Sequence, residues 1–203
     1  MTNIPVKKKQ IKQIKIMGEI DFSIQLISIH WLEKYDDADD RCAHGQIRII
    51  INNEIIVDEQ PDDEWWTLSA AAFHLLRTLE IDHTTNKPVA DCLIPSEGHH
   101  IDHHKNDPFV HIETAYPMAR GLNWWVIHNG NNVILDTENK LKISIPFSLY
   151  KQQVLSFVDK VETFYENSKP KNMPNSEYDP DGYDREGYIK FWAEWHHRRN
   201  KWN

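Results

Sequence analysis

The sequence predicts an α+β fold, in which a mostly antiparallel sheet is covered on one face by about three helices. Several runs carry apolar residues at every second position and are joined by short polar turns, as the strands of hairpins are. Longer segments repeat apolar residues every three or four positions, as amphipathic helices do. Strands and helices do not alternate one for one, which disfavours a parallel α/β sheet. A chain of 203 residues with 40% hydrophobic residues suits one globular domain.

The first predicted elements are three strands. Residues 20–26 alternate between apolar and polar side chains, which predicts a strand with one buried face. Residues 46–51 and 54–57 are rich in isoleucine and are separated by Asn52-Asn53. Because asparagine tolerates a positive φ, this pair predicts a tight hairpin turn.

A helix is predicted next, over about residues 64–80. Its apolar residues recur at helical spacing, and the acidic run of residues 62–64 would lie at its N-terminus, where the helix dipole favours negative charge. Residues 92–94 predict a short strand that ends at Pro95. The polar stretch of residues 96–108 is expected to be a loop.

The second half of the chain predicts a meander followed by a long helix. Residues 123–128, 132–136 and 141–145 have strand character and are joined by short turns, which predicts three antiparallel strands. The following segment, from Pro146 to Tyr165, carries a clear amphipathic stripe.

These patterns divide the chain into three parts. We expect a single α+β domain over residues 1–167, including a basic N-terminal segment, then a tether rich in Pro and Asn over residues 168–183. Residues 184–203 predict a tryptophan-rich helix that docks back on the domain, because exposed tryptophans would form an adhesive surface. The apolar residues expected on this helix are Tyr188, Ile189, Trp192, Trp195 and Trp202.

Charge is distributed unevenly along the chain. The formal net charge is −8. The only charged residues in the segment 1–18 are lysines, whereas residues 19–64 hold 13 acids against three bases. An acidic body repels nucleic-acid phosphates, so the charge favours a basic protein partner instead. The candidate partner-binding residues are the acids that flank the predicted hairpin: Asp36, Asp37, Asp39, Asp40, Asp58, Glu59, Asp62, Asp63 and Glu64.

The sequence also favours a cytoplasmic protein without a membrane segment. Its apolar runs are shorter than the ~20 residues that cross a bilayer, and no signal-peptide core follows Lys7, Lys8 and Lys9. The two cysteines, Cys42 and Cys92, are interpreted as reduced and buried, since two distant cysteines make no disulfide framework.

The leading functional hypothesis is a non-enzymatic binding protein. The sequence contains neither a nucleophile elbow nor a Gly-rich phosphate loop, so no catalytic residue and no cofactor is assigned. A small acidic cytosolic protein of this kind fits an immunity-type inhibitor that neutralises a basic toxin enzyme, such as a nuclease. The oligomeric state is left open.

The alternative hypothesis is a metal-dependent hydrolase that uses the loop His99–His104. Histidine and aspartate together are the ligands that zinc and similar metals prefer. The order His100-Ile101-Asp102-His103 partly resembles the His-x-His-x-Asp-His loop of metallo-β-lactamase-type hydrolases, although Gly98 stands where the first histidine of that loop is expected. The resemblance implies a metal-bound water as the nucleophile, with Asp102 as a base or an orienting group.

Overall fold

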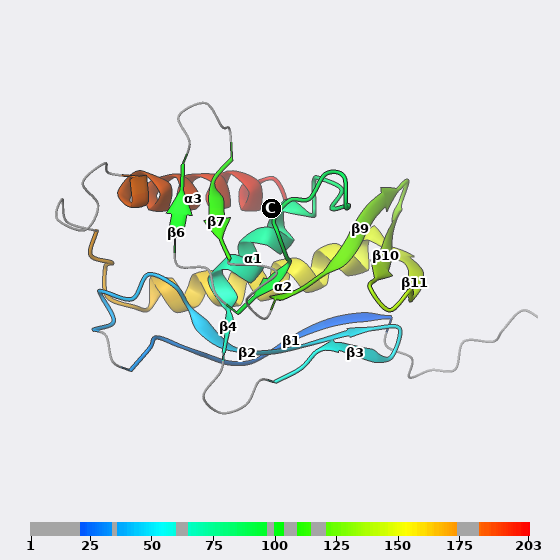
Figure 1. Cartoon of the computed structure of the whole chain (residues 1–203), viewed down its shortest axis with the longest axis horizontal. Helices are drawn as coiled ribbons and strands as arrows, with labels where there is room; N and C mark the ends of the chain where they lie inside the picture. Colours follow the sequence, from blue (N-terminus) through cyan, green and yellow to red (C-terminus); the bar gives the residue numbers. More distant parts are fainter. Residues whose placement is uncertain are drawn as a thin grey trace, which may run out of the picture.

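The computed structural model of the chain has an α+β fold, as predicted, and its elements form three layers (Figure 1). A β-sheet forms one layer, helices α1 and α2 cover one of its faces, and helix α3 lies on the side of α1 that is remote from this sheet. The structure describes residues 21–33, 36–59, 65–96, 100–103, 109–114, 121–173 and 183–203.

The first sheet contains the predicted hairpin. Strand β2 pairs in antiparallel fashion with β1 and β3, and also with the short strand β4. Asn52 and Asn53, which join β2 to β3, have φ values of 51° and 65°, so the turn uses the positive φ that asparagine tolerates. The strands span Phe22–His30 (β1), His44–Ile51 (β2), Glu54–Val57 (β3) and Trp66–Thr67 (β4).

The predicted meander is also confirmed. Strands β9 (Trp124–Asn129), β10 (Asn132–Thr137) and β11 (Lys142–Pro146) pair in sequence order. Two short pairs complete the strands: β5 (Ile94–Pro95) with β8 (Gly121–Leu122), and β6 (His100–Asp102) with β7 (His111–Glu113).

Strand β6 corrects one prediction, because residues 96–108 were expected to be a loop throughout. Ile101 of β6 is paired with Ile112 of β7, and both side chains are buried. Three residues are too few to show an alternating pattern, so their strand character depends on the distant partner strand.

Three helices are present: α1 (Leu68–Arg77), α2 (Phe147–Glu166) and α3 (Tyr183–Asn200). Helix α1 begins later than predicted, because Trp66 and Thr67 pair with β2 as a strand. No acidic residue lies in its first turn, and the acids at 62–64 are outside the described residues. All of α1 is buried, since it lies between the sheet and α3.

Helix α3 docks through aromatic side chains. Phe191 and Trp195 are buried, and the Phe191 ring centroid lies 4.5 Å from that of Phe73 on α1. Ile189, which was expected on the apolar stripe, is 53% exposed, and Phe191 takes the buried position instead. Among the described residues, no helix is both long enough and apolar enough to cross a membrane.

Candidate functional site

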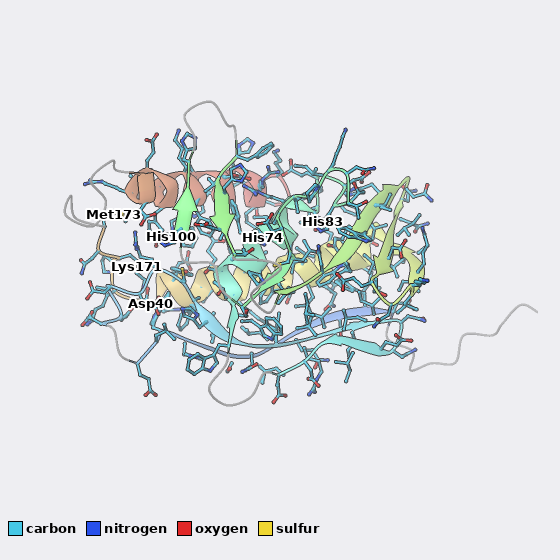
Figure 2. The ribbon with its side chains drawn as sticks, viewed as in Figure 1. Asp40, His74, His83, His100, Lys171 and Met173 are labelled. Atoms are coloured by element: carbon cyan, nitrogen blue, oxygen red, sulfur yellow. The ribbon has the colours of Figure 1, made fainter. Side chains whose placement is uncertain are left out.

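The loop between β1 and β2 carries the first group of predicted partner-binding acids. We call residues Asp36–Asp40 the acidic loop. Against it lies the segment that follows α2, residues Ser168–Met173, which we call the basic strap. Figure 2 shows Asp40 of the acidic loop and Lys171 and Met173 of the strap at the same end of the molecule.

The carboxylates of the acidic loop are bound by the strap. Lys169 donates its Nζ to both carboxylate oxygens of Asp36, at 2.9 and 3.1 Å, and its main-chain N–H to Asp37 at 3.0 Å. Lys171 donates to Asp37 as well, at 2.7 Å, and the Asn172 side chain donates to Asp39 at 2.8 Å. The site therefore consists of a negative loop that already holds a positively charged segment.

These contacts keep the loop ionised. The N–H of Ala38 and the ammonium of Lys169 lower the pKa of Asp36, and Lys171 together with the N–H of Lys169 lowers the pKa of Asp37. Hydrogen bonds to a carboxylate favour its charged form. The ionised forms of Asp36 and Asp37 are therefore favoured by their partners.

Asp40 has a different role from its neighbours. Its carboxylate is buried and accepts hydrogen bonds from the N–H groups of Leu32, at 2.8 Å, and Cys42, at 3.1 Å. Burial alone would raise the pKa of Asp40, but the nearby His44 imidazole, whose Nε2 lies 3.6 Å from Oδ1, and the hydrogen bonds from the two N–H groups outweigh it and lower the pKa. Asp40 fixes the ends of the acidic loop, and its burial removes it from the exposed surface.

The second group of predicted acids lies elsewhere. Asp58 and Glu59 follow β3 and both pair with Arg48 of β2, at 2.8 and 3.1 Å. The acidic loop lies at the first residue of β2, because Asp40 Oδ1 is 3.6 Å from Nε2 of His44. Arg48 is four residues further along β2, which corresponds to about 13 Å. The described acids therefore form two separate groups, while Asp62, Asp63 and Glu64 lie outside the described residues.

Three residues that matter here were missed in the sequence. Lys169 and Lys171 lie in the segment that was interpreted only as a tether, and no role was predicted for Trp31. The Lys171 ammonium lies over the Trp31 ring, 3.2 Å from its centroid. The one available signal was the placement of two lysines around Pro170, opposite in charge to the acidic loop.

Two histidines, His100 in β6 and His103 just after it, lie near acidic side chains at the start of α3. His100 Nδ1 lies 3.6 Å from Asp184, and His103 Nδ1 lies 3.7 Å from Glu186. In the part of the chain that the structure describes, no three His, Cys, Asp or Glu side chains are grouped closely enough to hold a metal ion. His99 and His104, which belong to the same predicted loop, lie outside that part.

A pocket of about 290 Å³ lies where α1 approaches β7. The guanidinium of Arg77 in its wall is already bound to Glu194 and to the carbonyl oxygens of Val89 and Val110. The pocket is otherwise lined mainly by apolar residues, including Ile81 and Ile112. The donors of Arg77 are therefore engaged within the protein.

The cysteines do not add a reactive group. Neither Cys42 nor Cys92 forms a disulfide, both are buried, and burial raises the pKa of each thiol to about 12. Only the thiolate is an effective nucleophile, so both side chains act as small apolar groups near neutral pH.

No family model, no curated protein and no solved structure matches this chain.

Proposed function

We propose that this protein is a binding protein that captures a basic segment of another protein through the acidic loop. The observation that supports the proposal is the basic strap itself, which lies against Asp36, Asp37 and Asp39 as a bound peptide would. The ligand chemistry is therefore a short, extended segment with lysines. Complementary charge of this kind accelerates association and selects the partner.

An inhibitor of a basic enzyme would be one such binding protein. The strongly negative stretch of residues 19–64 would attract a cationic enzyme over a distance of about a Debye length, ~8 Å at physiological salt. The acidic loop would then hold lysines on the surface of that enzyme. This mode of action requires neither a catalytic residue nor a cofactor in this chain.

An octalysine peptide tests the proposal by isothermal titration calorimetry on the full chain, at 25 and 250 mM salt. We expect the octalysine to bind more weakly at 250 mM salt than at 25 mM salt. At the same salt concentration, the Asp36→Asn/Asp37→Asn variant should bind it about tenfold more weakly than the unmodified chain, a loss of ~1.4 kcal/mol. The matched control is Asp58→Asn/Glu59→Gln, which removes two carboxylates from the second acidic group and should change the affinity by less than about threefold. If octalysine fails to bind both the full chain and a strap variant with Lys169→Ala and Lys171→Ala, the proposed function is wrong.

A further inference from the structure

Lys171 is enclosed although it carries a charge. Its side chain is only 5% exposed, and its ammonium lies over the Trp31 ring, with the Tyr165 ring centroid 5.8 Å away. The ammonium also donates hydrogen bonds to the carboxylate and to the main-chain carbonyl oxygen of Asp37. We call the enclosure formed by Trp31, Asp37 and Tyr165 the lysine slot.

The lysine slot matches a primary ammonium. A lysine ammonium has three N–H donors; two are taken by oxygens of Asp37, and the ring of Trp31 stabilises the remaining positive face. A guanidinium is planar and spreads five donors over a wider area. The slot is therefore suited to lysine rather than to arginine.

The two aromatic walls of the slot are held by the body of the protein. The Trp31 ring packs against Phe164 and Tyr165 of α2, with centroid distances of 4.5 and 4.8 Å. The Tyr165 hydroxyl donates to the carbonyl of Arg41 at 2.8 Å and accepts the N–H of Ala43 at 3.0 Å. Because these contacts do not involve the strap, the aromatic walls of the slot keep their positions when Lys171 leaves it. The Asp37 carboxylate, which the strap binds, is then free to accept another ammonium.

The strap, by contrast, is held mainly by polar contacts near the surface. Residues 168–173 form neither a helix nor a strand. The Asn172 N–H bonds to the carbonyl of Ala38 at 2.7 Å, the Lys169 side chain is 59% exposed, and Met173 is only partly buried. Segments with few buried apolar contacts open locally at low free-energy cost.

We propose that the lysine slot is a receptor for a lysine side chain of the partner, and that Lys171 fills it as an internal competitor until the partner displaces the strap. This inference rests on the proposed function, because it names the residue type that the basic partner supplies. Because Lys171 belongs to the same chain as the slot, its effective concentration there is high. A lysine of another protein therefore competes only when neighbouring contacts add to its affinity. The strap thereby selects partners that contact both the slot and the rest of the acidic loop.

A peptide with the strap sequence Ser-Lys-Pro-Lys-Asn-Met, acetylated and amidated at its ends, tests the slot directly. We expect this peptide to bind the Lys171→Ala chain at least tenfold more tightly than the unmodified chain, because only the variant has an empty slot. Lys169→Ala is the matched control: it removes an exposed lysine of the strap but leaves the slot filled, and should bind the peptide at least threefold more weakly than Lys171→Ala does. A peptide with arginine in place of the second lysine should lose at least tenfold in affinity for the Lys171→Ala chain.

Trp31→Leu in the Lys171→Ala chain should abolish peptide binding, since leucine keeps an apolar side chain but removes the π face. Asp37→Asn in the Lys171→Ala chain should also abolish peptide binding, and this variant does not disturb the aromatic contacts. Equal binding of the strap peptide to the unmodified, Lys169→Ala and Lys171→Ala chains would overturn the inference. So would the absence of binding to the Lys171→Ala chain, even if octalysine binds elsewhere on the acidic loop and the proposed function stands.

The reactivity of the Lys171 amine measures whether the strap is displaced. Amine acylation followed by mass spectrometry of the full chain should label Lys169 readily and Lys171 at least tenfold more slowly, because only Lys171 is enclosed. A brief pulse of reagent that acylates only a small fraction of the octalysine amines should label Lys171 at least fivefold faster with saturating octalysine than without it, at the same concentration of free reagent. Labelling of Lys171 as fast as Lys169 in the free chain, or labelling unchanged by bound octalysine, would contradict an exchangeable strap.

Discussion

Arg77 of α1 and Glu194 of α3 form a two-pronged ion pair inside the protein. Arg77 Nε lies 2.8 Å from Oε1 of Glu194, Nη2 lies 2.9 Å from Oε2, and the side chains are only 6% and 10% exposed. Arg198 donates to the same carboxylate. Burial alone would raise the pKa of Glu194, but the hydrogen bonds and charges of the two arginines lower it.

Glu194→Gln should therefore destabilise the protein by about 3 kcal/mol, because the buried Arg77 guanidinium loses its carboxylate partner, whereas Arg198 keeps its pair with Glu80 at 3.0 Å. Chemical denaturation at pH 7 measures the loss. Asp159→Asn is the matched control, since it breaks the pair of the half-exposed Asp159 with Arg199 and should cost about 1 kcal/mol or less. A larger loss for Asp159→Asn than for Glu194→Gln would contradict a buried ionic link between α1 and α3.

His74 should make stability fall in acid. It is buried in α1, and burial together with the charge of Arg77 lowers its pKa from 6.5 to about 3. Between these values the unfolded chain binds a proton at His74 that the folded chain does not, so the free energy of unfolding decreases as pH falls, by up to ~1.4 kcal/mol per pH unit.

The comparison of His74→Gln with the unmodified chain isolates this effect. Urea denaturation at pH 5.5 and 4.5 should show that the unmodified chain loses about 1.4 kcal/mol more than the variant over this interval. Equal losses in the two proteins would mean that His74 takes up its proton in the folded state.

Gly45→Ala should disrupt the pairing of β1 with β2. Gly45 has a φ of 156°, and a Cβ there would lie 2.1 Å from the carbonyl oxygen of Ser28. Because that oxygen belongs to a paired strand, we expect a loss of about 3 kcal/mol or more.

Gly130→Ala provides the comparison for this prediction. Gly130, in the turn between β9 and β10, also has a positive φ, but a Cβ there would meet open space. Its expected cost is the ~1 kcal/mol of a left-handed backbone conformation alone. Thermal unfolding of the two variants should separate these effects; similar losses would show that the close contact at Gly45 relaxes without cost.

Thr78→Val should cost more than Tyr150→Phe. The Thr78 hydroxyl donates to the carbonyl of Leu75 at 2.6 Å, so the buried Tyr150 hydroxyl must be the donor in its 2.7 Å bond to Thr78. Thr78→Val leaves the Tyr150 hydroxyl without an acceptor, at about 1–3 kcal/mol, whereas Tyr150→Phe removes one hydrogen bond, at about 1 kcal/mol. Denaturation of both variants measures the difference, and the reverse order would contradict this donor assignment.

Periodic segments could be predicted because their burial pattern repeats within the segment. The hairpin of β2 and β3, the meander of β9–β11 and helix α2 each contain enough residues to show a period of 2 or 3.6. The positive φ of Asn52 and Asn53 was equally local, since it depends on the asparagine side chain and its neighbours in the chain. Strand β6 lacks this local information, because its pairing depends on a segment that follows it in the chain.

The acids of the candidate site show what local patterns leave open. The sequence by itself determined that carboxylates gather before and after the hairpin, but not which of them stay exposed. The tertiary structure decided that Asp40 is buried, that Arg48 pairs with both Asp58 and Glu59, and that Lys171 from over 130 residues away occupies the slot beside Trp31. The physical reason is that the strength of an electrostatic contact depends on distance and solvent exposure, and these are fixed only when remote segments pack together.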